Sequence, residues 1–361
     1  MAPVVRALRA VCGGGLEVTV CVTGQHREML DSVLNLFGLV PDFDLQVMRP
    51  DQDVAEVTVG VLSGIRKVNA AARPDLVLVQ GDTTTTFAAS LAAFYDRVPV
   101  GHVEAGLRTH NVHAPWPEEM NRRLTGAIAT LHFAPTEQAR SNLLAEGVDT
   151  RCVYVTGNSV IDALLWISEC LDSDPGLAAD LARQFSFLDS GRRLLLVTGH
   201  RRESFGAGFE RICLALRDLA GRDDVQIVYP VHLNPNVQEP VRRILGGLSN
   251  VHLVEPLAYL PFVFLLKRAY LVITDSGGLQ EEAPSLGKPV LVMRDRTERP
   301  EAVEAGTAKL VGTSRERIVA ETLRVLTDED EYRRMSRAHN PYGDGHAGPR
   351  IAEICAQFLE S

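Results

Sequence analysis

The stretch that decides the fold is Leu271–Arg294, with the sequence LVITDSGGLQEEAPSLGKPVLVMR. A short apolar, β-branched run enters the turn Asp275–Gly278, and a short helix over Gln280–Leu286 precedes a second apolar run, Pro289–Met293. The order strand, glycine turn, helix and strand is the unit of a parallel sheet covered by helices. Free backbone N–H groups and the positive end of the helix dipole meet at such a turn, so it predicts an anion site.

An ordinary interpretation of this turn is that Ser276 only caps the following helix. Glu281 and Glu282 in the first helical turn suit the helix dipole in either case. Arg299, just after the next strand, favours the anion, because a guanidinium group binds phosphate oxygens in a bidentate manner. We therefore expect a phosphate to bind the turn and Arg299.

The composition describes a globular protein with no general attraction to polyanions. The 361 residues are 45% hydrophobic, and 37 basic against 46 acidic residues give a net charge of −9. This charge argues against wholesale binding to nucleic acid or to an anionic membrane, so an anionic substrate needs local positive groups. The six scattered cysteines form no C-x-x-C pair, which predicts a reduced, cytoplasmic protein without a metal site. We also expect neither a transmembrane segment nor a signal peptide.

Strands and helices alternate nearly throughout, which predicts an α/β protein with two doubly wound, Rossmann-like domains and a cleft between them. We expect the first domain over residues 1–157, joined by a C-terminal helix within 340–361, and the second over 158–339. The stretch Asp172–Gly176 is the expected interdomain region, and Gly13–Gly15 is an expected loop. The expected strands are Glu17–Thr23, Leu76–Gln80, Val98–Glu104, His132–Ala134, Cys152–Val155, Arg193–Thr198, Val225–Val231, Val251–Glu255, Leu271–Thr274, Pro289–Met293 and Lys309–Val311.

Polar segments follow four of these strands, where ligands of such sheets bind. Asp82 follows the first of the four, and its ordinary role would be to cap a helix that starts at Thr83. Glu104 follows the next, where a lone carboxylate is costly unless it is functional or pairs with a residue such as Arg108.

The other candidate residues also have both a structural and a functional interpretation. Glu118 and Glu119 lie at a helix start that follows a proline, where acidic residues also serve the dipole. His200 and His232 lie in polar loops, where a histidine is often simply solvated, although Arg201 beside His200 suits a phosphate.

Seven blocks, in order over essentially the whole chain, carry a resemblance to a known family: QGDTTTTFAASLAAFY, GHVEAGLRT, PWPEEMNR, VTGHRRESFG, YPVHLNPNV, TDSGGLQEEAPSLGKPVLVMRDRTERPEAVEAGT and NPYGDGHA. Together they resemble the bacterial, non-hydrolysing UDP-N-acetylglucosamine 2-epimerases. The resemblance implies a glycosyltransferase-B-type fold, a homodimer and no cofactor. It also implies reversible conversion of UDP-GlcNAc to UDP-ManNAc, a precursor of surface polysaccharides, by elimination of UDP to a 2-acetamidoglucal and re-addition.

The resemblance also implies roles for individual residues. The catalytic group is Asp82, Glu104, Glu118 and His200, and which carboxylate is the base stays open. The substrate-binding group is Arg122, Phe262, Ser276, Gly277, Gly278, Glu282 and Arg299, with Phe262 and Glu282 on the uridine part. Bacterial members carry a second UDP-GlcNAc site that activates the enzyme, and the blocks that resemble it contain Gln25, Arg27, Glu119, Arg201 and His232.

The chain departs from the family pattern at its start and at Leu257, where related sequences often carry a polar residue. Family members place a buried strand and a Gly-Thr-Arg-Pro-Glu turn before the Met-Ala-Pro segment that is Met1–Pro3 here. Without that strand we expect two unpaired strand edges and an apolar gap, and a chain that is weakly stable and poorly active as given. Three alternatives remain: a glycosyltransferase of the same fold, a hydrolysing relative, and a non-catalytic UDP-sugar-binding protein.

Overall fold

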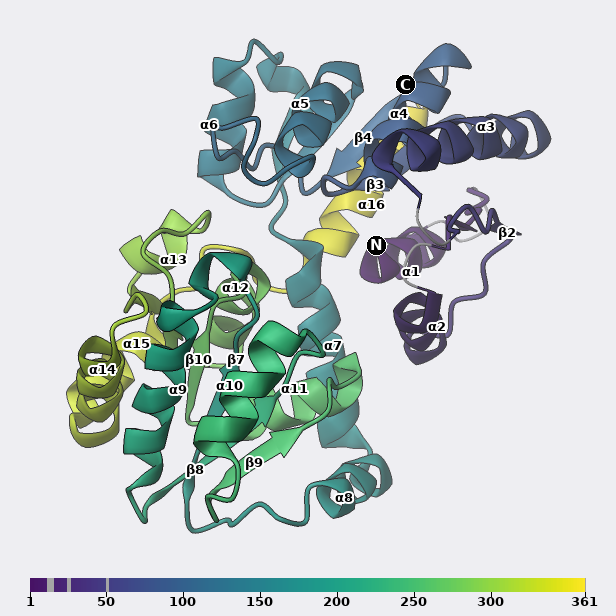
Figure 1. Ribbon diagram of the computed structural model, residues 1–361. Coiled ribbons are helices and arrows are strands. Elements are labelled where there is room, and N and C mark those ends of the chain that lie inside the picture. The colour runs from purple at the N-terminus through teal and green to yellow at the C-terminus, as the bar shows by residue number, and fades with distance from the viewer. Residues whose placement is uncertain (12–15, 25–26, 50–51, 361) are drawn as a thin grey trace. The chain divides into compact units, whose positions relative to one another are not determined.

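The computed structural model describes residues 1–11, 16–24, 27–49 and 52–360 (Figure 1). They form two compact units: unit 1 comprises Met1–Ala163 and Tyr342–Ser361, and unit 2 comprises Leu164–Pro341. The loop expected over Gly13–Gly15 lies outside the described residues. Among the described residues, no helix combines the length and the apolar character that a bilayer crossing requires.

The boundary between the units falls inside helix α7 (Ser159–Ser173). The prediction of an interdomain region over Asp172–Gly176 was therefore wrong. Asp174 instead caps the next helix, α8 (Pro175–Gln184), because its side chain accepts a hydrogen bond from the Leu177 N–H at 3.0 Å. Proline at the first helical position completes this start signal.

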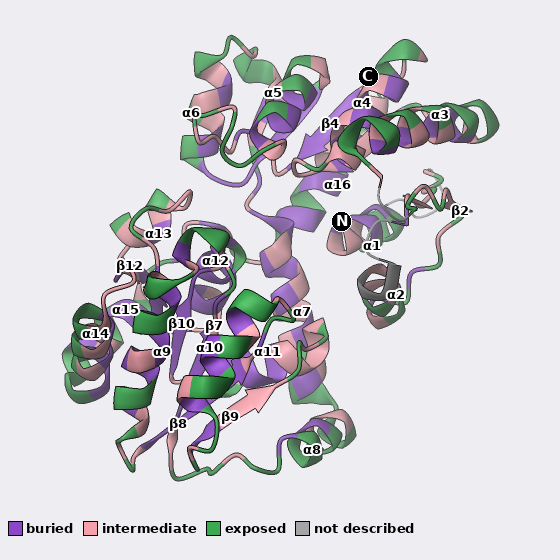
Figure 2. Ribbon diagram, viewed as in Figure 1, coloured by how far each residue is buried: buried purple, intermediate pink, exposed green. Residues whose placement is uncertain are grey.

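Unit 2 is built on one sheet of six parallel strands in the order β12-β11-β10-β7-β8-β9. The strands are β7 (Arg193–Thr198), β8 (Val225–Pro230), β9 (Val251–Val254), β10 (Leu271–Thr274), β11 (Val290–Val292) and β12 (Ala308–Leu310). The helices are α9 (Ala207–Ala220), α10 (Pro235–Leu245), α11 (Tyr259–Arg268), α12 (Gly277–Ser285), α13 (Pro300–Glu304), α14 (Arg315–Thr327) and α15 (Glu329–Arg337), with a 3₁₀ turn η2 (Arg202–Ser204). Figure 2 shows β7 and β10 buried and α9 exposed along one side, as expected for strands covered by helices.

The centre of this sheet fixes where a ligand can bind. β7 lies beside β10, and the strand order runs from this pair toward β8 and β9 on one side and toward β11 and β12 on the other. In open parallel sheets, ligands bind beyond the carboxyl ends of the strands at such a reversal. The predictions of strands over Arg193–Thr198 and Leu271–Thr274 are confirmed by β7 and β10.

Unit 1 contains a four-stranded parallel sheet in the order β3-β4-β5-β6 and a separate parallel pair, β1-β2. The strands are β1 (Cys21–Val22), β2 (Phe43–Asp44), β3 (Val77–Gln80), β4 (Val100–Val103), β5 (Leu131–Ala134) and β6 (Val153–Val155). The helices are α1 (Ala2–Val11), α2 (Arg27–Leu36), α3 (Val54–Ala72), α4 (Thr84–Tyr95), α5 (Glu118–Ile128), α6 (Glu137–Ala145) and α16 (Ala347–Glu360), with a 3₁₀ turn η1 (Thr150–Cys152). The strand expected over Glu17–Thr23 is reduced to β1, and β2 had no prediction.

The C-terminal helix α16 belongs to unit 1 and packs against α1. Val4 and Leu8 of α1 share one core cluster with Ile351 and Cys355 of α16. The close approach depends on Gly348, since a Cβ atom there would lie 3.0 Å from the carbonyl oxygen of Pro3. This core cluster also contains Val103 of β4, so α1 and α16 pack on the four-stranded sheet. The carboxyl ends of β3 and β4 in this sheet carry the first candidate site.

Candidate functional site

Asp82 follows β3 and does not cap the helix after it. The N-cap of α4 is Thr83, whose hydroxyl accepts a hydrogen bond from the Thr86 N–H at 3.2 Å, so the capping interpretation of Asp82 was wrong. The Asp82 carboxylate forms an ion pair with Arg122 of α5 instead. The side chain of Asp82 is 30% exposed and that of Arg122 is 9% exposed, so a buried cation holds a carboxylate that solvent still reaches.

Glu104 follows β4, the neighbour of β3, in a backbone conformation that few residues adopt. Its φ of +64° lies in the left-handed region, which is unfavourable for a residue with a Cβ atom and is often found at functional sites. The alternative that Glu104 pairs with Arg108 was wrong, because Arg108 binds Glu146 in a bidentate manner at 2.8 and 2.7 Å. The Glu104 carboxylate accepts a hydrogen bond from Asn158 Nδ2 at 3.4 Å.

Asp82 and Glu104 lie together at the carboxyl ends of adjacent strands. A Cβ atom placed on Gly81, the residue before Asp82, would be 3.4 Å from Oε2 of Glu104. His102 fixes this corner, with its Nε2 2.8 Å from the carbonyl oxygen of Gly81. Burial lowers the pKa of His102 to about 3, so the ring is neutral and donates its Nε2 proton to that carbonyl. Sequence reasoning missed His102, which sits in an otherwise apolar strand.

Glu118 and Glu119 begin α5, and the structure separates their environments. Glu118 is half-buried, whereas Glu119 is fully buried. The Glu119 carboxylate accepts hydrogen bonds from the backbone N–H groups of Thr109 and His110 at 3.0 and 3.2 Å and pairs with Arg122 at 3.3 Å. Glu119 therefore ties the segment after β4 to α5, and Arg122 joins it to Asp82.

In unit 2, α12 begins directly after the Asp275–Ser276 turn that follows β10, and the Ser276 N–H donates to the Thr274 hydroxyl at 2.9 Å. Ser276 occupies the N-cap position of α12, as the ordinary interpretation expected, but its side chain makes no capping hydrogen bond in the described structure. A Cβ atom on Gly277 would lie 2.6 Å from Glu298 Oε1 and 3.8 Å from the Arg201 guanidinium. The turn is thus crowded by a carboxylate and an arginine, which pair with each other at 3.3 Å.

Arg299 and the two glutamates of α12 form buried pairs behind this turn. Arg299 pairs with Glu281, and these side chains are 12% and 2% exposed. Glu282 accepts a hydrogen bond from the Tyr259 hydroxyl at 2.7 Å. Burial raises the pKa of Glu282 to about 7, and the neighbouring Glu281 carboxylate adds to this while the tyrosine opposes it.

The end of β7 is held against the start of the same turn. Asp275 is fully buried, and its Oδ2 accepts hydrogen bonds from the backbone N–H groups of His200 and Arg201 at 2.7 and 2.8 Å. The His200 ring stacks on His232, with ring centroids 5.2 Å apart and an interplanar angle of 11°. The sequence did not indicate that Asp275 would be buried or that it would bind the backbone of His200 and Arg201, because aspartate is common in ordinary turns.

Comparison with known proteins identifies the chain's relatives. The family model of UDP-N-acetylglucosamine 2-epimerase matches residues 11–356. The UDP-N-acetylglucosamine 2-epimerase of Escherichia coli strain K12 is 61% identical over 354 residues, which cover 98% of this chain and 94% of the relative. The chain belongs to the UDP-N-acetylglucosamine 2-epimerase family.

Solved structures of this epimerase family agree. The UDP-GlcNAc 2-epimerase of Neisseria meningitidis, bound to UDP-GlcNAc, superposes with a TM-score of 0.92 at 48% identity, covering 99% of this chain and 96% of that one. The enzyme of Methanocaldococcus jannaschii, in complex with UDP-GlcNAc and UDP, has a TM-score of 0.80 at 32% identity, covering 99% and 95%. The predicted α/β fold with two Rossmann-like, glycosyltransferase-B-type sheets is thereby confirmed.

The structure groups the epimerase residues predicted from sequence within each unit. In unit 1, Asp82 and Glu104 lie together, and Arg122 binds Asp82. In unit 2, His200 and Arg201 lie after β7, beside the Ser276–Gly278 turn. Phe262 lies half-buried on α11, three residues after Tyr259.

Two residues of the predicted activating site cannot be placed. Gln25 lies outside the described residues, and Arg27 begins α2 with a side chain outside them. The roles of Glu119, Arg201 and His232 in that site stay predictions.

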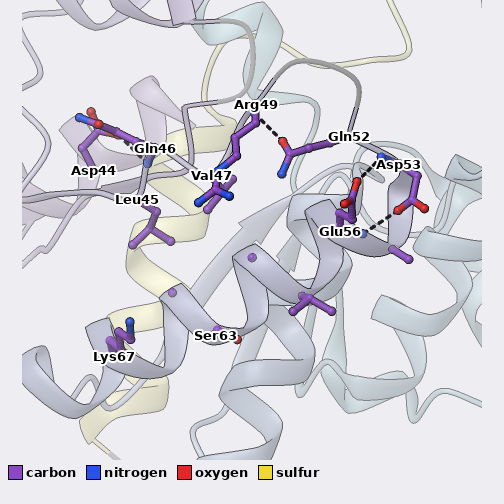
Figure 3. A pocket seen from close by; sticks show the side chains of 14 residues that line it. Asp44, Leu45, Gln46, Val47, Arg49, Gln52, Asp53, Glu56, Ser63 and Lys67 are labelled. Carbon is purple, nitrogen blue, oxygen red and sulfur yellow. Dashed lines mark hydrogen bonds between the residues drawn. The ribbon is translucent and has the colours of Figure 1, made fainter.

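A hollow of about 830 Å³ lies elsewhere in unit 1, between the segment after β2 and α3 (Figure 3). Two of its polar groups serve the fold: Asp53 and Glu56 form a capping box at the start of α3, with hydrogen bonds of 2.9 and 2.8 Å. The Arg49 N–H donates to the side chain of Gln52. Among the described residues that line this hollow, none was predicted for the epimerase site.

Proposed function

We propose that this chain catalyses the reversible conversion of UDP-GlcNAc to UDP-ManNAc. The observation that carries the proposal is the pair of carboxylates, Asp82 and Glu104, at the ends of adjacent strands in a family whose solved members bind UDP-GlcNAc. A C2 inversion needs one group that removes a proton from one face of the sugar and one that delivers a proton to the other. Two carboxylates in different environments supply such a pair.

The reaction begins with loss of the leaving group, because the C2 hydrogen is not next to a carbonyl and is not acidic. The bond between C1 and the phosphate oxygen breaks, and UDP leaves with the electron pair. A carboxylate then takes the C2 proton, and the C–H electrons form the C1–C2 double bond of 2-acetamidoglucal. Protonation of C2 on the opposite face and return of UDP to C1 complete the inversion. Asp82, Glu104 and Glu118 are the proposed acids and bases, and a nearby carboxylate also stabilises positive charge at C1.

The departing UDP needs positive groups in unit 2. The Ser276–Gly278 turn, through the N–H groups of Gly277 and Gly278, and the guanidinium of Arg299 are proposed to bind the phosphates. His200 acts beside them, at the phosphates or at the intermediate. Phe262 contacts the uridine part, and the Glu282 carboxylate accepts hydrogen bonds from the ribose hydroxyls.

Regulation and assembly follow the family pattern in the same proposal. The chain forms a homodimer, needs no cofactor, and is activated by UDP-GlcNAc at a second site that includes Arg201 and His232. Reaction rates measured from pure UDP-ManNAc test this activation. A lag phase that disappears when UDP-GlcNAc is added supports the proposal. Linear progress that UDP-GlcNAc does not stimulate contradicts it.

We further propose that full activity requires one more strand between β1 and β3. Among the described residues, β1 pairs only with β2 and β3 pairs only with β4, so both present an edge. The two edges are neighbours, since Cys21 packs on the core cluster that contains Val79 and the Thr23 hydroxyl lies 3.3 Å from that of Thr85. Fusing an N-terminal segment designed to add a strand between these two edges should raise both the melting temperature and the turnover. Unchanged values for both would contradict this proposal.

The epimerase proposal is tested by following UDP-GlcNAc with the purified chain by proton NMR. UDP-ManNAc as the product, with no net release of UDP, supports it. Accumulation of UDP with free ManNAc would instead identify a hydrolysing enzyme. UDP-GlcNAc binding without turnover, in the chain and in its extended form, would identify a binding protein.

A further inference from the structure

Asp275 occupies a position from which one carboxylate controls two segments of unit 2. It directly follows β10 and precedes the Ser276–Gly278 turn, and its N–H donates to the carbonyl of Thr198 at 3.2 Å. Its Oδ2 holds the backbone of His200 and Arg201. The proposed phosphate turn and the proposed catalytic histidine are therefore joined through a single buried side chain.

The second carboxylate oxygen of Asp275, Oδ1, points to a role beyond holding the backbone. Oδ1 of Asp275 is buried and has no hydrogen-bond partner among the described residues, and it lies 3.6 Å from Nδ1 of His200. A buried carboxylate oxygen without a donor is costly, and the imidazole is the side chain placed to supply one. Only the tautomer of His200 with a proton on Nδ1 can do so.

We propose that Asp275 is a positioning residue that keeps the His200 proton on Nδ1 and leaves the lone pair of Nε2 free for the reaction. This inference rests on the proposed function, in which His200 acts at the phosphates or the intermediate. In this arrangement the buried carboxylate selects the tautomer of the imidazole, and the opposite ring nitrogen takes part in the reaction.

The groups around His200 are consistent with this assignment. Burial lowers the pKa of His200, the Asp275 carboxylate opposes that effect, and His232 and Arg201 add to it, so the ring is neutral near pH 7 and its tautomer matters. His232 covers one face, but its Nδ1 is occupied by the Asn234 N–H at 3.1 Å. The guanidinium of Arg201 pairs with Glu298 at 3.3 Å.

Tyr229, in the neighbouring strand β8, provides a control because it contacts the same loop. Its buried hydroxyl donates to the carbonyl of Gly199 at 2.9 Å, and burial raises its pKa, so it stays uncharged. Tyr229→Phe loosens the segment before His200 without changing the carboxylate. A purely structural role for Asp275 would make Tyr229→Phe and Asp275→Asn behave alike.

The test is Asp275→Asn in the full chain labelled with ¹⁵N-histidine. The amide oxygen of asparagine can still accept the two backbone N–H bonds, which turns its NH₂ group toward Nδ1 of His200 and drives the proton to Nε2. Long-range ¹H–¹⁵N spectra, assigned with His200→Gln, should show Nδ1–H in the wild type, Nε2–H in Asp275→Asn and Nδ1–H in Tyr229→Phe. We expect turnover in Asp275→Asn to fall about 10²-fold, with KM for UDP-GlcNAc nearly unchanged.

An Nε2–H tautomer in the wild-type protein overturns the inference even if Asp275→Asn does not fold. The same tautomer in wild type and Asp275→Asn, or the same switch in Tyr229→Phe, overturns it as well. The spectra do not depend on turnover, so a chain that fails to epimerise UDP-GlcNAc would refute the proposed function while the role of Asp275 is still decided.

Discussion

Replacing Glu282 by glutamine should change how the stability of unit 2 depends on pH. Glu282 is buried against Tyr259, and burial raises its pKa to about 7 from the 4.5 of an unperturbed glutamate. Each pKa unit corresponds to 1.36 kcal/mol, so the ionised carboxylate costs the folded state about 3 kcal/mol. Between pH 4.5 and 7 the folded protein binds more protons than the unfolded protein at this site. Its stability from this source therefore falls as the pH rises through that window.

The assay is urea denaturation of the wild type and of Glu282→Gln at several pH values. Trp166 reports on unit 2 in a Trp116→Phe background, because these are the chain's two tryptophans and Trp116 belongs to unit 1. The variant should gain on the wild type by up to about 3 kcal/mol between pH 4.5 and pH 7.5. Glu255→Gln, which removes an exposed carboxylate of the same unit, is the control and should not reproduce this gain. A constant difference between wild type and Glu282→Gln across the window would refute the reasoning.

Two further substitutions test the site. Arg122→Ala removes one cation from the buried Glu119 and the ion-pair partner of Asp82. The variant should be destabilised by about 3 kcal/mol in denaturation, and steady-state kinetics should show a larger loss of turnover than of substrate binding. An unaltered turnover would show that Asp82 does not take part in the reaction. Gly277→Ala places a Cβ atom 2.6 Å from Glu298, so UDP affinity measured by calorimetry should fall at least about 10-fold, whereas an unchanged affinity would place the phosphates elsewhere.

Local patterns in the sequence predicted the parts of the site that depend on neighbouring residues. The order of strand, glycine turn and helix after Leu271 gave β10 and the turn before α12 because a few adjacent residues fix that geometry. The same local reasoning misjudged Asp82, since Thr83 is an equally good cap and the competing partner, Arg122, lies 40 residues away.

Contacts between distant segments explain what the sequence did not reveal. Nothing adjacent to Asp275 indicates that its carboxylate reaches the backbone of His200, 75 residues earlier. The burial of Glu119 rather than Glu118 depends on where the Thr109–His110 segment packs. The stretch Asp172–Gly176 was misjudged as an interdomain region, because Asp174 and Pro175 mark a helix start as readily as a linker.

Inversion at C2 is proposed to proceed by removal and return of the C2 proton, and solvent deuterium reports on this step. UDP-GlcNAc is incubated in D₂O with the chain and with its N-terminally extended form, and the C2 and anomeric signals are followed by proton NMR. We expect UDP-ManNAc that carries deuterium at C2, formed faster by the extended form. Formation of UDP-ManNAc that retains its C2 hydrogen, or no exchange with either protein, would contradict it.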